Sequence, residues 1–146
     1  MRLAGRMIKC GSFWAVEVPI LDVATQGRSK RDAYEMIADA VESLVNRKGF
    51  AVRVFPGAAG IFEIGASDEA ALTALLLRRA RVRSGLSLAE VAARLGQKSV
   101  NAYARYEQGR AVPSVLKLSQ LYAAVSRTGD FVLDESRANR TAERAP

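Results

Sequence analysis

The chain has 146 residues, with 49% hydrophobic and 25% charged residues and a formal net charge of +7, a composition typical of globular proteins. It contains no histidine and a single cysteine, Cys10, which excludes histidine-based catalysis, the common zinc sites and an intramolecular disulfide. No apolar run reaches membrane-spanning length and residues 1–11 lack the apolar core of a signal peptide, so we expect a cytoplasmic protein.

Residues 1–66 are predicted to form an α+β domain, a small antiparallel sheet with one helix. Alternating apolar residues and turn signals predict five strands, at residues 3–10, 13–18, 23–26, 50–55 and 61–64. Ser29 and Asp32 have capping-box spacing at the start of an amphipathic helix, and Gly49 is the expected residue after its C-terminus. The predicted order is βββαββ, with the helix on one face of the sheet.

Residues 67–128 are predicted to be entirely helical, followed by a mobile polar tail at 129–146. Ser67 is the expected N-cap of a helix that runs to about Arg83. Its candidate core residues are Leu72, Leu75, Leu76 and Val82. Pro113 and Ser114 begin the last helix of this domain.

Residues 85–110 are predicted to form two short helices joined by a tight turn. Ser87 and Glu90 have capping-box spacing at the start of the first helix. Gly96 ends this helix, and Ser99 is the expected N-cap of the second. This order of helix-start and helix-end signals is typical of a helix-turn-helix.

The second helix of the pair has two different faces. Tyr103 and Tyr106 lie three residues apart on the expected inner face, whereas Asn101 and Arg105 lie four apart on the outer face. Such a helix can pack against a core and place polar side chains in a DNA major groove. We expect Glu107 to be structural, because a carboxylate that faced DNA would repel phosphates.

The positive charge of the chain is concentrated near this helix pair. Residues 78–110 hold eight lysines and arginines against Glu90 and Glu107, as expected of a surface that faces phosphates. The run from Arg78 to Arg83 is either a solvated helix face or a source of phosphate contacts, and the sequence leaves both open.

Residues 72–125 resemble the repressor/Cro-type, XRE-like helix-turn-helix family. The family's RxxRxxxGLS opening is matched from Arg78 to Ser87, its AxxLG helix end from Ala92 to Gly96, and its YEQG end from Tyr106 to Gly109. This resemblance implies that the second helix of the pair reads bases with its N-terminal residues. The base-facing residues that it implies are Val100, Asn101 and Arg105. The phosphate-contacting residues that it implies are Lys98, Ser99 and Arg110.

A second resemblance concerns the N-terminal domain. Trp14 to Gly27 reads WAVEVPILDVATQG and precedes a capped amphipathic helix. This pattern resembles the HicB antitoxin family, by motif over residues 13–49 and by domain order over the chain. The resemblance implies a partial ribonuclease-H-like domain that binds a small ribonuclease toxin of the HicA type, and a C-terminal DNA-binding module.

Together the resemblances imply an antitoxin that neutralises its toxin and represses its own operon by binding a palindromic operator, most simply as a dimer. Two alternatives stay open. One is a stand-alone regulator whose N-terminal domain senses a ligand or oligomerises, and the other is a protein-interaction module that has lost DNA binding.

We do not expect an enzyme. A ribonuclease-H-type site needs clustered carboxylates that hold a divalent metal. The acidic residues Glu17, Asp22, Asp32 and Glu63 are instead scattered over strands, a turn and a helix start. We therefore expect no catalytic residues, no cofactor and no metal site.

Overall fold

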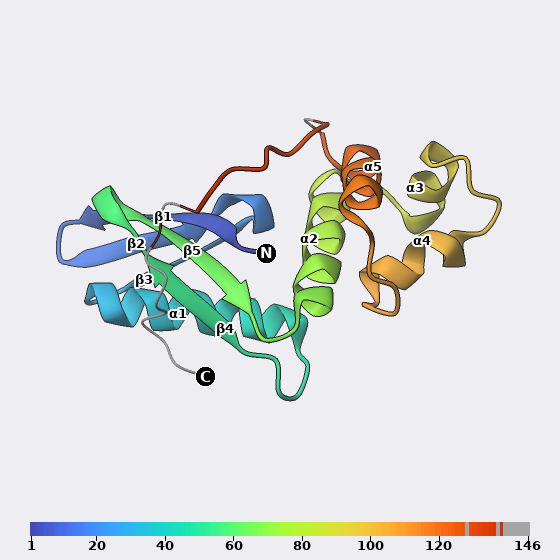
Figure 1. The fold of residues 1–146 in the computed structure, drawn as a ribbon. Coiled ribbons are helices and arrows are strands. Elements are labelled where there is room, and N and C mark those ends of the chain that lie inside the picture. The colour runs from blue at the N-terminus through green and yellow to red at the C-terminus, as the bar shows by residue number, and fades with distance from the viewer. Residues whose placement is uncertain (128, 137, 139–146) are drawn as a thin grey trace. The chain divides into compact units, whose positions relative to one another are not determined.

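The computed structural model describes residues 1–127, 129–136 and 138. Its residues divide into two compact units, one formed by 1–69 together with the described residues from 135 onward, and one formed by 70–134 (Figure 1). The tail predicted at 129–146 lies outside the described residues at 137 and 139–146. No helix of the described ranges is long and apolar enough to cross a membrane.

The first unit is a five-stranded antiparallel sheet with strand order β3-β2-β1-β5-β4. Its elements are β1 (Leu3–Cys10), β2 (Phe13–Val18), the 3-10 turn η1 (Pro19–Leu21), β3 (Val23–Gly27), α1 (Lys30–Val45), β4 (Val52–Pro56), η2 (Ala58–Gly60) and β5 (Ile61–Ala66). The sheet, its single helix and the helical region that follows confirm the predicted fold class.

α1 covers one face of this sheet (Figure 1). Strand residues alternate between the two faces, so Val16 and Val18 of β2 are buried, as are Ile37 and Val41 of α1. Ser29 caps α1 as predicted, since its hydroxyl accepts a hydrogen bond from the Asp32 backbone N–H at 3.1 Å. The amphipathic pattern therefore identified both the helix and its buried side.

The C-terminus of α1 differs from the prediction. Asn46, not Gly49, is the left-handed residue at the helix end, with φ of 49°. Asparagine tolerates this conformation better than most residues because its short polar side chain bonds locally. Gly49 has positive φ in the turn that follows, which leads into β4 two residues later than the expected start at Phe50.

The start of the second unit also differs from the prediction. The Ser67 hydroxyl accepts a hydrogen bond from the Ala51 backbone N–H at 3.0 Å, and α2 begins later, at Glu69. Ser67 thus joins the two chain segments beside β4 and β5, and the N-cap expected at this residue was wrong.

The described residues of the second unit form four helices. They are α2 (Glu69–Arg83), α3 (Leu88–Arg94), α4 (Val100–Glu107) and α5 (Val115–Val125). The expected core residues Leu72, Leu75 and Leu76 are buried, but Val82 is 57% exposed, because the buried part of α2 ends at Ala80.

Candidate nucleic-acid interface

α3 begins with the predicted capping box. The Ser87 hydroxyl accepts a hydrogen bond from the Glu90 backbone N–H at 3.2 Å, and the Glu90 carboxylate accepts one from the Ser87 backbone N–H at 2.7 Å. Both bonds satisfy N–H groups that have no partner within the helix. The bond from the Ser87 backbone lowers the pKa of Glu90. The start of α3 is therefore fixed by reciprocal bonds.

The turn between α3 and α4 depends on Gly96. This residue has φ of +67°, a left-handed conformation that costs a residue with a side chain about 1–2 kcal/mol. It allows the N–H groups of Gly96 and Gln97 to bind the carbonyls of Ala93 and Ala92 at 3.0 and 2.9 Å. These two bonds form a Schellman motif, which closes the end of α3 and directs the chain into α4.

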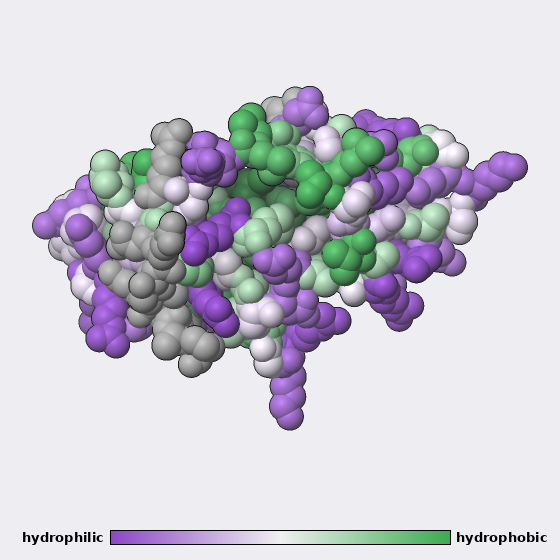
Figure 2. All heavy atoms as spheres, in the orientation of Figure 1, coloured by the Kyte–Doolittle hydropathy of each residue, from purple (hydrophilic) through white to green (hydrophobic). Residues whose placement is uncertain are grey.

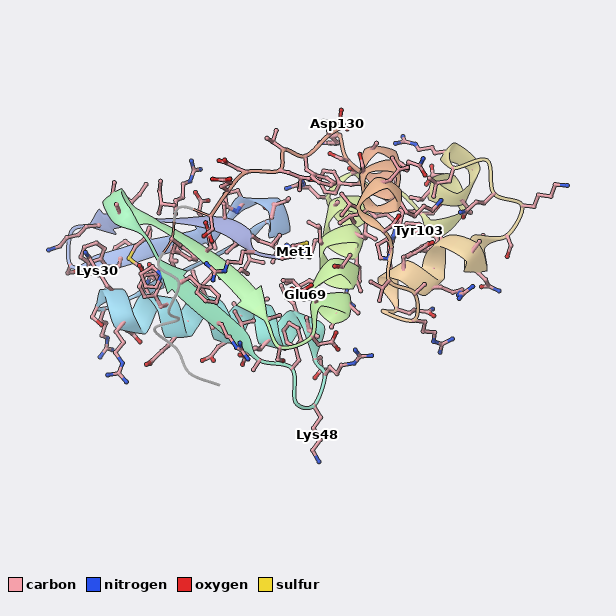
Figure 3. All side chains as sticks on the ribbon, in the orientation of Figure 1. Met1, Lys30, Lys48, Glu69, Tyr103 and Asp130 are labelled. Carbon is pink, nitrogen blue, oxygen red and sulfur yellow. The ribbon has the colours of Figure 1, made fainter. Side chains whose placement is uncertain are left out.

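The inner face of α4 is held by a buried polar network. Tyr103 is fully buried inside the helical domain (Figure 3), and its hydroxyl donates a hydrogen bond to Glu107 Oε1 at 2.6 Å. The Arg81 guanidinium of α2 binds the same carboxylate through Nε at 2.7 Å and Nη2 at 2.9 Å. Its Nη1 donates to the Leu86 carbonyl at 2.9 Å. The network joins α2, the loop before α3, and α4.

Two groups of this network, Arg81 and Tyr103, have shifted pKa values. The hydrogen bond to Glu107 raises the pKa of Arg81, and burial raises the pKa of Tyr103. Arg81 therefore stays charged and Tyr103 neutral across the physiological pH range. The Glu107 side chain is only 6% exposed and is paired with Arg81 inside the domain, which confirms its predicted structural role.

The opposite face of α4 is exposed. Val100, Asn101 and Arg105 are all solvent-accessible, while Tyr103 and Ala104 face inward. Asn101 and Arg105 form no side-chain hydrogen bond within the described ranges. Because they lie four residues apart, they project from the same face of the helix. The Asn101 amide and the Arg105 guanidinium are therefore free to contact a partner.

The predicted phosphate contacts flank α4 at its two ends. Lys98 and Ser99 are exposed before its first turn, and Arg110 is exposed after its last. Neither Lys98 nor Arg110 pairs with an acidic side chain of the described part of the chain. Hydrophilic side chains cover much of the surface over α3 and α4 in the view of Figure 2. The exposed charges of Lys98, Arg105 and Arg110, on and beside α4, are positive.

Ser99 differs from the other serine N-caps. Ser29, Ser87 and Ser114 each accept a hydrogen bond from a backbone N–H of their helix. Ser99 makes no such bond, although it occupies the N-cap position of α4. The Ala102 N–H binds the Ser99 carbonyl at 3.2 Å. The N–H groups of Val100 and Asn101 and the Ser99 hydroxyl form no hydrogen bond with the described residues, so an anion can bind them, the usual use of a helix N-terminus in DNA-binding proteins.

The arginine run of α2 does not act as one surface. Arg81 is half-buried and fully engaged by Glu107 and Leu86, so it is removed from the candidate phosphate contacts. The pairing of Arg81 with Glu107 was not evident from the sequence, because 26 residues separate them. The one sequence signal for it was the expectation that Glu107 is structural. Arg78 and Arg83 are exposed on the same helix.

Residues 74–130 match the model of a protein family described as "Helix-turn-helix domain". These residues are a helix-turn-helix DNA-binding domain. Searches of curated proteins and of solved structures found no match to the chain. The helix-turn-helix domain begins within α2 and includes α3, α4 and α5, so the face of α4 that carries Asn101 and Arg105 belongs to it.

Proposed function

We propose that this protein is a transcriptional repressor in which α4 lies in the major groove of operator DNA. The observation that carries this proposal is the division of α4 between an inner face, on which Arg81 neutralises Glu107, and an outer face with unpaired Asn101 and Arg105. Asparagine makes bidentate contacts to adenine and arginine to guanine, and Val100 suits a thymine methyl group.

The flanking groups supply affinity that does not depend on sequence. Lys98 and Arg110 are placed to contact phosphates on either side of the groove, and Ser99 with the N-terminus of α4 offers a further anion contact. Short-helix readers of this kind bind operators as dimers across adjacent half-sites. We therefore propose a homodimer on a palindromic operator.

We further propose that the repressor is the antitoxin of a type II toxin–antitoxin pair and binds a small HicA-like ribonuclease through residues 1–66. Two features support this role. The WAVEVPILDVATQG segment resembles HicB proteins, and the sheet with its one helix forms a compact unit separate from that of the helix-turn-helix. A separate unit allows toxin binding and DNA binding to use different surfaces.

Binding, not catalysis, is the proposed activity of the first unit. Its carboxylates are used in local contacts: Glu17 pairs with Arg6, and Glu63 accepts hydrogen bonds from Arg2 at 3.3 Å and from Ser136 at 2.7 Å. Asp32 accepts one from the Arg28 backbone N–H at 2.6 Å. These contacts support a structural role for the acidic side chains.

DNA binding is tested by fluorescence anisotropy of the full chain on the DNA upstream of its own coding sequence, against a scrambled duplex of equal length and composition. The proposal predicts tighter binding to the upstream DNA and a smaller preference for it in Arg105→Ala. Arg53→Ala, at an exposed arginine of β4, is the matched control and should bind as the unmodified chain does. Equal binding to both duplexes by the unmodified chain would contradict the repressor role.

The antitoxin role is tested by co-expression with a neighbouring reading frame whose product is a small, basic protein that contains histidine. Expression of the neighbour alone should arrest growth, and this chain should restore it and co-purify with the product. A chain that binds its upstream DNA but neither restores growth nor captures the neighbour would favour a stand-alone regulator instead.

A further inference from the structure

A concavity of about 470 Å³ opens on the first unit where the β1–β2 hairpin, the start of α1 and the β4–β5 loop meet. Its volume lies within the range of roughly 300–1,000 Å³ that is usual for small-molecule sites. Its lining residues are Met7, Ile8, Lys9, Trp14, Lys30, Tyr34, Gly57, Ala59 and Gly60. None of them is acidic.

Two ammonium groups converge on one aromatic ring in this concavity. Lys9 Nζ lies 5.6 Å from the centroid of the Trp14 indole ring, and Lys30 Nζ lies 4.9 Å from it. Both lysines are exposed, and neither pairs with an acidic group of the described ranges. Asp32, in the same turn as Lys30, is bound instead to the Arg28 backbone N–H. The concavity therefore carries two positive charges that no acidic side chain of residues 1–127, 129–136 and 138 neutralises.

The position of Lys30 opposes the dipole of its own helix. Lys30 is the first residue of α1, where a cation is disfavoured by the positive end of the helix and an acidic residue is preferred. Such a placement is explained if the charge serves a ligand. An anion bound at this point would interact favourably with both ammonium groups and with the helix terminus.

The walls of the concavity are firmly held. The Tyr34 side chain is buried and packs edge-on against Phe62, with ring centroids 5.5 Å apart. In the β4–β5 loop, Ala59 has φ of +54°, a left-handed conformation that is costly for alanine. Strained backbone is concentrated at ligand sites, where the surrounding structure holds it.

We propose that this concavity, the Trp14 site, binds the phosphate monoester group of a small molecule. A phosphate monoester carries nearly two negative charges at neutral pH, which match the two ammonium groups of Lys9 and Lys30. A diester carries one negative charge, and nucleic-acid binding needs a track of cations along which several phosphates can lie. Here the two cations lie within 5.6 Å of one ring centroid and form no extended track, which favours the small molecule over a nucleic acid.

The binding experiment uses the full chain, whose only tryptophan is Trp14. Its fluorescence is titrated at constant ionic strength with inorganic phosphate, phenyl phosphate and the monoanion dimethyl phosphate, and each Kd is repeated by calorimetry. Saturable binding of phosphate and phenyl phosphate is expected, with dimethyl phosphate weaker by at least about tenfold because it presents one charge to two lysines.

Three variants test the residues. Lys30→Gln and Lys9→Gln should each weaken phosphate binding by about tenfold or more, through the loss of one charge-assisted hydrogen bond. Lys48→Gln is the matched control, because Lys48 is an exposed lysine in the loop beyond the other end of α1 and extends away from the sheet (Figure 3). Far-UV circular dichroism checks that each variant is folded; loss of a cation from the start of α1 favours the helix.

Several results would overturn the proposal. One is that neither fluorescence nor calorimetry detects saturable phosphate binding. Another is that Lys48→Gln weakens phosphate binding as much as Lys30→Gln does. A third is that dimethyl phosphate binds with the same affinity as phosphate. A single-stranded oligonucleotide that binds in a Lys30-dependent manner, while phosphate and phenyl phosphate do not, would also overturn it in favour of a nucleic-acid site. The outcome is independent of operator binding by α4.

Discussion

The Arg81 guanidinium of α2 donates hydrogen bonds to both carboxylate oxygens of Glu107 in α4, at 2.7 and 2.9 Å. The Tyr103 hydroxyl donates to one of the same oxygens. Bidentate pairs of this kind fix orientation as well as distance. Since Glu107 and Arg105 lie on opposite sides of one short helix, the pair sets the direction in which α4 presents its exposed face.

Glu107→Gln is expected to destabilise the chain by about 3–5 kcal/mol, because it leaves the half-buried Arg81 guanidinium without its counter-charge. Urea unfolding followed by far-UV circular dichroism measures the loss. The double variant Arg81→Met with Glu107→Leu removes both charges and should lose much less. If Glu107→Gln unfolds at the same urea concentration as the unmodified chain, the pair does not hold α4.

Arg105→Ala is expected to cost about 1–3 kcal/mol in binding to the specific operator and to relax specificity at one base pair. The reason is that Arg105 is exposed and unpaired on the outer face of α4. Anisotropy titrations with every base substituted in turn at each operator position measure both effects. An equal loss on operator and scrambled DNA would show a phosphate contact in place of base reading.

Lys98→Gln and Arg110→Gln should act differently from Arg105→Ala. Each is expected to weaken binding to all DNA sequences alike and to reduce the slope of log K against log salt concentration by about one. Titrations at several salt concentrations give the slope. Lys48→Gln, far from α4 in sequence and exposed, should leave it unchanged. A slope unaffected by Lys98→Gln would remove that residue from the phosphate contacts.

Local signals in the sequence were enough to place most elements. The alternation in β1 and β2 and the apolar stripe of α1 gave the strand and helix positions, and the N-cap signal at Ser29 and the capping box at Ser87 gave two helix starts. These signals depend on neighbouring residues only. The exposed face of α4 was likewise predictable, since Asn101 and Arg105 lie about one helical turn apart on one face, whereas the buried Tyr103 lies half a turn from each.

Contacts between distant residues were not predictable in the same way. Ser67 has the features of an N-cap, but its hydroxyl binds Ala51 across the sheet edge, and the partner of Glu107 is an arginine of a different helix. The Trp14 site likewise depends on strand register, because Lys9 lies opposite Trp14 in the β1–β2 pair while Lys30 comes from α1. Register and packing decide these pairs, and a single sequence does not contain them directly.

Gly96→Ala is expected to destabilise the chain by about 1–2 kcal/mol, because alanine is disfavoured at φ of +67°. No atom lies near enough to clash with an added Cβ, so the effect comes from the backbone alone. Gly96→Asn is the matched variant and should lose less, since asparagine tolerates this conformation. Urea unfolding ranks the three chains. Equal losses in the two variants would indicate that packing, not backbone conformation, requires glycine at this turn.

The capping box of α3 gives the stability a defined pH dependence. The pKa of Glu90 is lowered in the folded chain by the hydrogen bond from the Ser87 N–H, so the folded state prefers the carboxylate. A group with a depressed folded-state pKa stabilises fully above its unfolded pKa, and this contribution is lost as the pH falls through the folded-state value.

Glu90→Gln should therefore reduce the free energy of unfolding at about pH 7, where the carboxylate is ionised in both states. The difference between Glu90→Gln and the unmodified chain should shrink as the pH is lowered to about 3, because the lost interaction is then absent from both. Urea unfolding at a series of pH values measures this difference, and taking it between two chains cancels the titration of the other acidic groups. A difference that is constant over the whole range would show that Glu90 caps α3 without its charge.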